Sequence, residues 1–261
     1  RSMAAATCHA VVQLTSCSAE RPPKTTTRWV RSLATTFTVL SLVVQLRASE
    51  VASAIGGRLV GDDVLIDGVH FDSRADIQHC LFVAIRADRN GHDFVPDAFS
   101  RGASCALVSE DVDDAAGSLI VVDDTMRAFS NLATHVRSQQ LSDVAVVGVT
   151  GSVGKTSTKN LIAGALSSTA VWASPKSFNN EQGVPFTLIN TPSGARTVVV
   201  EMGMRGFGEI THLCDVASPT IGVVTRVGQA HTARLGGIEG VAKAKAELVA
   251  SLPNSGTAVL N

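Results

Sequence analysis

The sequence feature that most constrains the fold is a glycine-rich run between an apolar segment and two hydroxyl residues. It reads Val144-Ala-Val-Val-Gly-Val-Thr-Gly-Ser-Val-Gly-Lys-Thr-Ser157. The apolar residues predict a buried strand, and the residues after the glycines predict the start of a helix. Backbone N–H groups in such a turn, together with a helix N-terminus, bind phosphate oxygens. Because position 149 is Val, the run departs from the strict G-x-x-x-x-G-K-[ST] pattern, and its glycines are Gly148, Gly151 and Gly154.

This loop predicts a nucleoside triphosphate site. Lys155 is expected to reach the outer phosphates, and the Thr156 hydroxyl is expected to ligate Mg²⁺. The predicted nucleotide-binding residues are Gly151, Ser152, Gly154, Lys155, Thr156 and Ser157. A guanine-specific switch protein is the weakest alternative, because the chain has no Asn-Lys-x-Asp string to read guanine.

Composition excludes several classes of protein. The 261 residues are enough for one large or two ordinary domains, and a hydrophobic content of 45% supports a substantial core. A net charge of −1 and an aromatic content of 4% give no basis for a nucleic-acid partner. Five cysteines without a C-x-x-C pair predict scattered thiols of a cytoplasmic protein. The apolar run 37–46 is too short to span a membrane, which needs about 20 residues.

Three regions follow one another along the chain. Residues 1–46, rich in Ser, Thr and Ala, are assigned no fold, and their composition is compatible with disorder. Residues 47–123 predict a small α/β unit, with helices at 48–55 and 94–101 and strands at 64–71, 80–85, 103–108 and 118–122. Residues 124–143 predict a connecting helix, capped by the run 123–125 and packed through Met126, Phe129, Leu132, Ala133 and Val136.

The third region, residues 144–261, predicts a doubly wound parallel sheet. Near-continuous apolar strands at 144–149, 197–200, 220–225 and 257–260 alternate with helices at 155–166 and 238–252. Ligands bind beyond the carboxyl ends of such strands. The phosphate loop, the run 177–181, Glu201 and the pair Gln229 and His231 all follow strands, so we expect them to converge at one edge.

Two of these polar residues suit a metal, because Mg²⁺ prefers carboxylates, hydroxyls and phosphate oxygens. Glu201 is either a metal ligand or a surface charge at the end of the sheet, and His231 is either a second metal residue or a structural histidine. Lys243 and Lys245 lie on the helix 238–252. Either they form a solvated face that pairs with Glu239 and Glu247, or a buried lysine carries a modification.

At this point the sequence resembles the Mur ligases, ATP-dependent amide-forming enzymes of peptidoglycan assembly. Within them it is similar to the MurF type, the UDP-N-acetylmuramoyl-tripeptide–D-alanyl-D-alanine ligases. The resemblance covers about residues 47–261. Besides the phosphate loop, it rests on Ser177-Phe-Asn-Asn-Glu-Gln-Gly-Val-Pro185, Glu201-Met-Gly-Met-Arg-Gly-Phe-Gly-Glu-Ile210, Gly228-Gln-Ala-His231, Gly236-Gly-Ile-Glu-Gly-Val-Ala-Lys-Ala-Lys-Ala-Glu-Leu248, Asp72-Ser-Arg74, Leu81-Phe-Val-Ala84 and Gly91-His-Asp-Phe94.

The resemblance implies a role for each matching residue. ATP and Mg²⁺ are the implied cofactors. Thr156, Glu201 and His231 are the implied metal residues, and Lys155, Lys245 and His231 the implied catalytic ones, with Lys245 carbamylated. Ser73, Arg74, Asn179 and Asn180 are expected to face the UDP-sugar peptide. A cytoplasmic monomer without a membrane span is expected, acting in cell-wall synthesis and so in cell shape and division.

The resemblance also implies a domain plan and a reaction. Residues 47–123 would bind the UDP-sugar, and residues 144–261 would form an incomplete central ATP-binding domain, with the C-terminal domain absent. We therefore expect the chain to be a fragment that is inactive alone. In the complete enzyme ATP would convert the peptide carboxylate to an acyl phosphate, which the amine of D-alanyl-D-alanine would attack.

Three positions depart from the family pattern. The run Gln78-His79-Cys80 replaces a Pro-Gly-Asp-like turn, Ala87 replaces a glycine, and Arg226 replaces an asparagine. Two alternatives to the MurF-type ligase stay open. One is a sister amide ligase that takes a single amino acid, and the other is a nucleotide-binding protein without catalysis.

Overall fold

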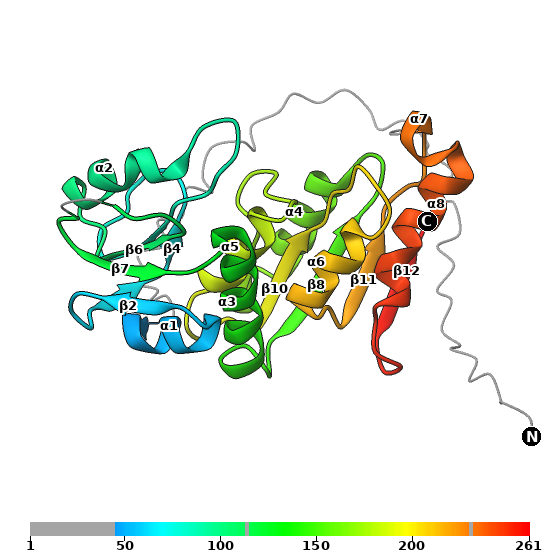
Figure 1. The fold of residues 1–261 in the computed structure, drawn as a ribbon. Coiled ribbons are helices and arrows are strands. Elements are labelled where there is room, and N and C mark those ends of the chain that lie inside the picture. The colour runs from blue at the N-terminus through cyan, green and yellow to red at the C-terminus, as the bar shows by residue number, and fades with distance from the viewer. Residues whose placement is uncertain (1–44, 113–114, 230–231) are drawn as a thin grey trace, which may run out of the picture. The chain divides into compact units, whose positions relative to one another are not determined.

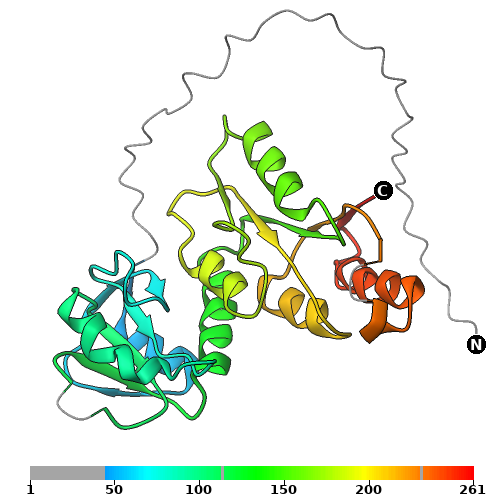
Figure 2. The same cartoon turned by 90° about the horizontal axis from the view of Figure 1, so that it is seen from above.

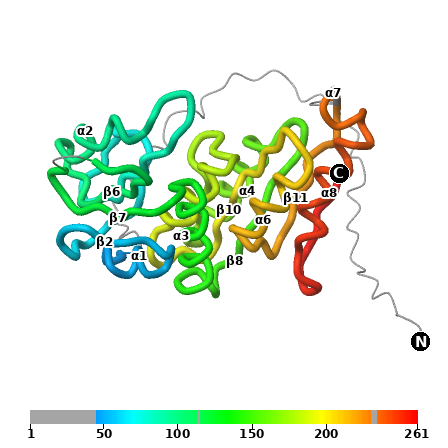
Figure 3. The backbone as a smooth tube through the Cα atoms, viewed as in Figure 1, coloured from blue at the N-terminus to red at the C-terminus, as the bar shows by residue number. Residues whose placement is uncertain are grey.

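The computed structural model describes residues 45–112, 115–229 and 232–261. Most of the region 1–46 and His231 lie outside these residues. The described chain contains two five-stranded sheets and one two-stranded sheet. The tube in Figure 3 follows the chain from the first five-stranded sheet through helix α3 (Thr125–Gln139) into the second. In the described residues no helix combines the length and apolar character needed to cross a lipid bilayer.

The structure opens with a strand and a short helix. β1 (Gln45–Arg47) pairs antiparallel with β3 (Leu65–Asp67), and α1 (Ala48–Ile55) lies between them in sequence. α1 ends where predicted, because Gly56 takes a left-handed conformation, with φ of 69°, that glycine adopts without steric cost.

The first five-stranded sheet has the strand order β2-β7-β6-β5-β4. Its strands are β2 (Arg58–Val60), β4 (Val69–His70), β5 (Leu81–Val83), β6 (Cys105–Val108) and β7 (Ser118–Val121). The prediction of one strand over 64–71 was wrong. Gly68, with φ of 82°, separates β3 from β4, and the two strands belong to different sheets. The helix expected over 94–101 begins earlier, as the 3₁₀ turn Gly91–Phe94 followed by α2 (Val95–Ser100).

Helix α3 (Thr125–Gln139) confirms the predicted connecting helix. The Asp124 carboxylate accepts hydrogen bonds from the N–H groups of Met126 and Arg127, which caps the first turn. The predicted apolar face is in the core: Phe129, Leu132, Ala133 and Val136 are buried. α3 contacts α1 on one side and α5 (Gly183–Ile189) and α6 (Glu209–Ala217) on the other (Figure 1).

The second five-stranded sheet is parallel throughout, as predicted, with the order β12-β11-β8-β10-β9. Its strands are β8 (Ala145–Thr150), β9 (Val171–Ala173), β10 (Thr197–Glu201), β11 (Ile221–Val224) and β12 (Thr257–Leu260). The remaining helices are α4 (Lys155–Ala165), α7 (Thr232–Leu235) and α8 (Ile238–Ala250).

Helices cover both faces of this parallel sheet (Figure 2). Val146, Val198 and Val200 face one core together with residues of α5, α6 and α8. Val147, Val149 and Val199 face the other side, where Ile162 of α4 packs. This alternation of neighbouring residues between two apolar layers is the pattern of a doubly wound fold.

One departure from the family pattern carries backbone strain. His79 has φ of 61°, in the left-handed region that side chains rarely adopt. It occupies the glycine position of the usual Pro-Gly-Asp-like turn. Its N–H donates to the Gly102 carbonyl, and its carbonyl accepts from the Asp67 N–H, so hydrogen bonds on both sides hold the turn.

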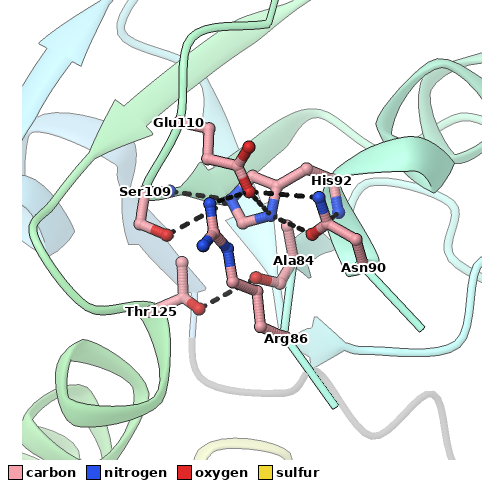
Figure 4. A network of polar contacts seen from close by, with 7 residues as sticks. All are labelled: Ala84, Arg86, Asn90, His92, Ser109, Glu110 and Thr125. Carbon is pink, nitrogen blue, oxygen red and sulfur yellow. Dashed lines mark hydrogen bonds and ion pairs between the residues drawn. The ribbon is translucent and has the colours of Figure 1, made fainter. Parts of the chain in front are cut away.

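A polar network ties the ends of β5 and β6 together (Figure 4). The ring of buried His92 accepts a hydrogen bond from the Ser109 N–H at Nε2 (2.8 Å), so its own proton must sit on Nδ1. Nδ1 lies 2.8 Å from Asn90 Oδ1 and 3.2 Å from Glu110 Oε1. Glu110 is also paired with Arg86. Nearby, the Thr125 hydroxyl donates to the Ala84 carbonyl (2.8 Å).

This network predicts a pH-dependent stability. Burial lowers the pKa of His92, Glu110 and Asp93 oppose the shift, and Arg86 adds to it. The unfolded chain therefore takes up a proton at a higher pH than the folded chain. The stabilising contribution is present above about pH 6.5 and is lost as the pH falls below that value.

Between pH 7.5 and pH 5.5, the free energy of unfolding is expected to fall less in His92→Gln than in the wild-type protein. Glutamine cannot be protonated in this range, and its carbonyl can still accept the hydrogen bond from the Ser109 N–H. Urea denaturation at both pH values measures the slope, and His79→Gln, at an exposed histidine, is the control. An unchanged slope in His92→Gln would contradict this role of the network.

Candidate active site

The phosphate loop lies between β8 and α4 and is held by the segment that follows β11. Ser152 N–H donates to the Arg226 carbonyl (2.7 Å), and the Gly228 N–H donates to Ser152 Oγ (2.9 Å). A Cβ at Gly151 would lie 1.9 Å from Thr225 Oγ1, so only glycine allows this approach. Arg226 contributes its backbone carbonyl while its side chain is exposed, which explains why an arginine is tolerated there.

Lys155 and Thr156 begin helix α4 directly after the loop. Lys155 Nζ donates to the Gly151 carbonyl (2.9 Å), so the side chain folds back over its own loop. Both residues are half-buried. A flexible ammonium above a turn of glycines is placed to meet an anion bound in that turn.

Glu201 is the hub of the site. It ends β10 and is 1% exposed. Thr156 Oγ1 donates to Glu201 Oε2 (2.8 Å), and Asn179 Nδ2 donates to Oε1 (2.9 Å). Its backbone N–H donates to Ser174 Oγ (3.1 Å). The structure therefore brings together Thr156 and Glu201, which the sequence proposed as metal residues.

Lys159 is a buried cation that the sequence analysis missed. It is 2% exposed, one turn after Lys155 on α4. Its Nζ donates to the carbonyls of Ser174 (2.6 Å) and Lys176 (2.5 Å), the segment that leads from β9 to the Asn179-Asn180 pair. Burial lowers the pKa of Lys159, and the charge of Glu201 opposes that shift. Its sequence position could have indicated this role, because Lys159 follows Lys155 by four residues and so lies on the same face of the helix.

Lys245 is also buried, at 3% exposure on α8. Burial, and then the charge of Lys155, lowers its pKa to about 8. The reading of Lys243 and Lys245 as a solvated face paired with Glu239 and Glu247 is wrong for Lys245. Glu247 instead accepts hydrogen bonds from the N–H groups of Gly208 and Thr211, at the start of α6.

A pocket of about 530 Å³ opens beside Lys155 and the Asn179-Asn180 pair. Several chain segments line it, with Lys155 from the phosphate loop, Asn179 and Asn180 from the loop before α5, and Arg205 and His212 from around α6. Asn179 points its amide at Glu201, and Asn180 Oδ1 accepts from the Gly183 N–H, which starts α5. Both asparagines therefore shape the pocket wall, in addition to any contact with a ligand.

Ser73 and Arg74 lie after β4, in the first five-stranded sheet. Ser73 is buried, and a hydrogen bond from its hydroxyl is the largest cause of the lowered pKa of Asp97. Arg74 is exposed and pairs with Asp72 through Nε (2.8 Å) and Nη2 (2.9 Å). Hydrogen bonds from Arg74 hold the pKa of Asp72 at about 2.

Comparison with known proteins shows similarity to the Mur ligases. Residues 149–261 match the Mur ligase middle domain. The UDP-N-acetylmuramoyl-tripeptide–D-alanyl-D-alanine ligase of Synechocystis sp. is 39% identical over 206 residues, which are 77% of this chain and 45% of the relative. The Escherichia coli ligase of the same name is 36% identical over 221 residues, 84% of this chain and 48% of the relative.

Residues 149–261 thus match a Mur ligase middle domain, and the chain is similar to MurF-type Mur ligases over part of their length. Members of this family are ATP-dependent ligases. MurF from Acinetobacter baumannii superposes with a TM-score of 0.76 at 27% identity, over 84% of this chain and 49% of that one. MurF from Thermotoga maritima in complex with ADP gives 0.65 at 29% identity, over 74% and 45%. The chain spans about half the length of these Mur ligases.

The buried Lys159 generates a stability prediction. Lys159→Met removes two charge-assisted hydrogen bonds and leaves two carbonyls without their donor, so we expect the free energy of unfolding to fall by roughly 2–4 kcal/mol. Urea denaturation measures it. Lys176→Met is the matched control, because the Lys176 side chain is exposed and should change stability by less than about 0.5 kcal/mol. Equal effects of the two substitutions would contradict the role given to Lys159.

Proposed function

We propose that this chain belongs to a ligase that joins D-alanyl-D-alanine to UDP-N-acetylmuramoyl-tripeptide, with ATP as the third substrate. The single observation that carries the proposal is the contact of Thr156 and Asn179 with Glu201. This contact brings together the start of α4, the end of β10 and the asparagine pair, next to the pocket that Lys155, Asn179 and Asn180 line. Relatives with the same order of motifs carry the name of this ligase.

The residues present fit Mg²⁺. A threonine hydroxyl and a buried carboxylate are hard oxygen donors, and Mg²⁺ is commonly held by one or two carboxylates together with substrate phosphates. The described residues contain no group of three or more His, Cys, Asp or Glu side chains placed to hold a metal by themselves. Thr156 and Glu201 would hold the ion, which would neutralise charge on the transferred phosphoryl group. His231 remains a proposed second metal residue.

The chain's own groups suit the proposed chemistry. Glycine N–H groups and Lys155 would bind the ATP phosphates. The oxygen of the peptide carboxylate would attack the γ-phosphorus, ADP would leave, and an acyl phosphate would form. The amine of D-alanyl-D-alanine would then attack the acyl carbon, lose a proton and expel phosphate. Lys155, which lines the pocket, and Lys159, whose charge interacts with that of Glu201, would offset negative charge at this site.

The remaining expectations extend this proposal. Residues 47–123 are the proposed UDP-sugar-binding domain, with Ser73 and Arg74 as contacts. Residues 124–143 connect it to the proposed ATP-binding domain, 144–261. We propose action in the cytoplasm, as a monomer, in peptidoglycan synthesis. Carbamylation of Lys245, which the resemblance implied, is not supported, because MurF-type relatives do not use a carbamylated lysine.

Phosphate release tests the proposed reaction. The 261-residue chain and the gene product that contains it would be assayed with ATP and Mg²⁺. Release is expected only when both UDP-N-acetylmuramoyl-tripeptide and D-alanyl-D-alanine are present, and the 261-residue chain alone is expected to release none. Lys155→Ala should abolish release and weaken ATP binding at least about tenfold, because a charged contact to phosphate is worth about 1.5–3 kcal/mol. Lys243→Ala, at an exposed cation of α8, is the control and should bind ATP normally.

Other results would change the assignment. Equal activity with a single amino acid as acceptor would indicate a sister ligase. ATP binding without turnover, for both proteins and under every substrate combination, would favour a nucleotide-binding protein without catalysis. Unchanged ATP affinity in Lys155→Ala would contradict the assignment of this loop as the ATP phosphate site.

A further inference from the structure

A side-chain amide at the end of α5 completes the edge of the first five-stranded sheet. Asn190 Oδ1 accepts from the Val69 N–H (3.0 Å), and Asn190 Nδ2 donates to the Val69 carbonyl (3.0 Å). Val69 lies on β4, which pairs only with β5 and forms the outer strand of this described sheet. Asn190 therefore does for Val69 what a neighbouring strand would do, across 121 residues of sequence.

The bridge is anchored on its own helix. Asn190 Nδ2 also donates to the Phe186 carbonyl (2.9 Å), one turn earlier on α5. An amide held at three points has little rotamer freedom left, so the position of α5 and the position of β4 are linked through a rigid group.

An aromatic cluster surrounds this bridge. The His70 ring lies edge-on to Phe186, with centroids 5.2 Å apart. The Phe71 ring lies 5.7 Å from those of Phe178 and Phe186. These ring contacts bury apolar surface around β4 and α5, and the two bonds of Asn190 define one register between them.

Each side of the bridge leads directly to a loop of the proposed site. On the side of β4, the Asp72–Arg74 loop follows His70, and the Asp72 N–H donates to His70 Nδ1 (3.1 Å). On the side of α5, Asn179 and Asn180 immediately precede the helix, and Asn179 contacts Glu201. Asn190 is thus the polar link between the proposed sugar-nucleotide loop and the hub of the phosphate site.

We propose that Asn190 is a positioning residue, which fixes the Asp72–Arg74 loop relative to the Asn179-Asn180 pair and so aligns a nucleotide-sugar peptide with the ATP phosphates. The inference rests on the proposed function. It assigns Asn190 no contact with either substrate. Only an amide suits the position, because an aspartate would set a second acceptor against the Val69 carbonyl and a leucine would leave both groups of Val69 without a partner.

The test separates the two substrates. Asn190→Leu is expected to raise KM for UDP-N-acetylmuramoyl-tripeptide about tenfold, the change that corresponds to loss of two neutral hydrogen bonds. KM for ATP should stay within about twofold, because the phosphate loop does not touch Asn190. Thr191→Val is the matched control: it removes a buried hydrogen bond to the Thr187 carbonyl (3.0 Å) in the same helix end without touching β4. It should leave both KM values unchanged.

Defined outcomes overturn the proposal. Unchanged KM values in Asn190→Leu, or an equal rise for both substrates, would show a structural role only. If Asn190→Leu does not fold, Asn190→Asp takes its place with the same expected split. A wild-type protein that neither binds nor uses the sugar nucleotide would instead refute the proposed function, and with it this role of Asn190.

Discussion

The structure of the site depends on one buried carboxylate. Glu201 is almost fully buried, and an ionised carboxylate away from water is costly unless hydrogen bonds and nearby cations compensate it. Its partners come from α4 and from the loop before α5, and its backbone is bound by Ser174. Satisfying this one carboxylate therefore requires two segments that are distant in sequence, α4 and the loop before α5, to meet at the carboxyl end of β10.

Close backbone approach is the second requirement. The phosphate loop bonds to the segment after β11 through Ser152, and the Thr225 hydroxyl donates to the Val153 carbonyl (2.6 Å). A side chain at Gly151 would prevent this contact. Because β8 and β11 are neighbours in the parallel sheet, their loops emerge side by side, and the glycine spacing of the loop follows from that packing.

Local patterns were enough to predict most of the architecture. The long apolar strands, the Asp124 cap and the face of α3 each carry their signal within a few residues, and the structure confirms them. Two of the short elements, β9 and α6, were not predicted. The three half-buried residues of β9 are too few to show a period, whereas α6 buries Ile210, Leu213 and Ala217 at helical spacing, a signal that the sequence analysis missed. The break between β3 and β4 at Gly68 was missed because an isolated glycine inside an apolar run can equally indicate a bulge within one continuous strand.

The site was predictable only in part. The phosphate loop and Glu201 stand at strand ends, so their meeting followed from the order of strands and helices. Lys159, Glu247 and Asn190 could not be found in that way, because their partners are backbone groups of segments whose positions only the tertiary structure defines. Lys245 shows the same limit: its sequence neighbours are charged and small, yet the helix turns it into the core.

The central claim is that Thr156 and Glu201 form the metal site of the phosphate loop. The most direct measurement is a crystal structure of the protein with Mn²⁺ and a non-hydrolysable ATP analogue, with the metal located from its anomalous scattering. The account predicts one peak at coordination distance from Thr156 Oγ1, roughly 2.1 Å, with Glu201 bound to the ion directly or through one water. A peak elsewhere, with the hydrogen bond from Thr156 to Glu201 intact, would contradict it.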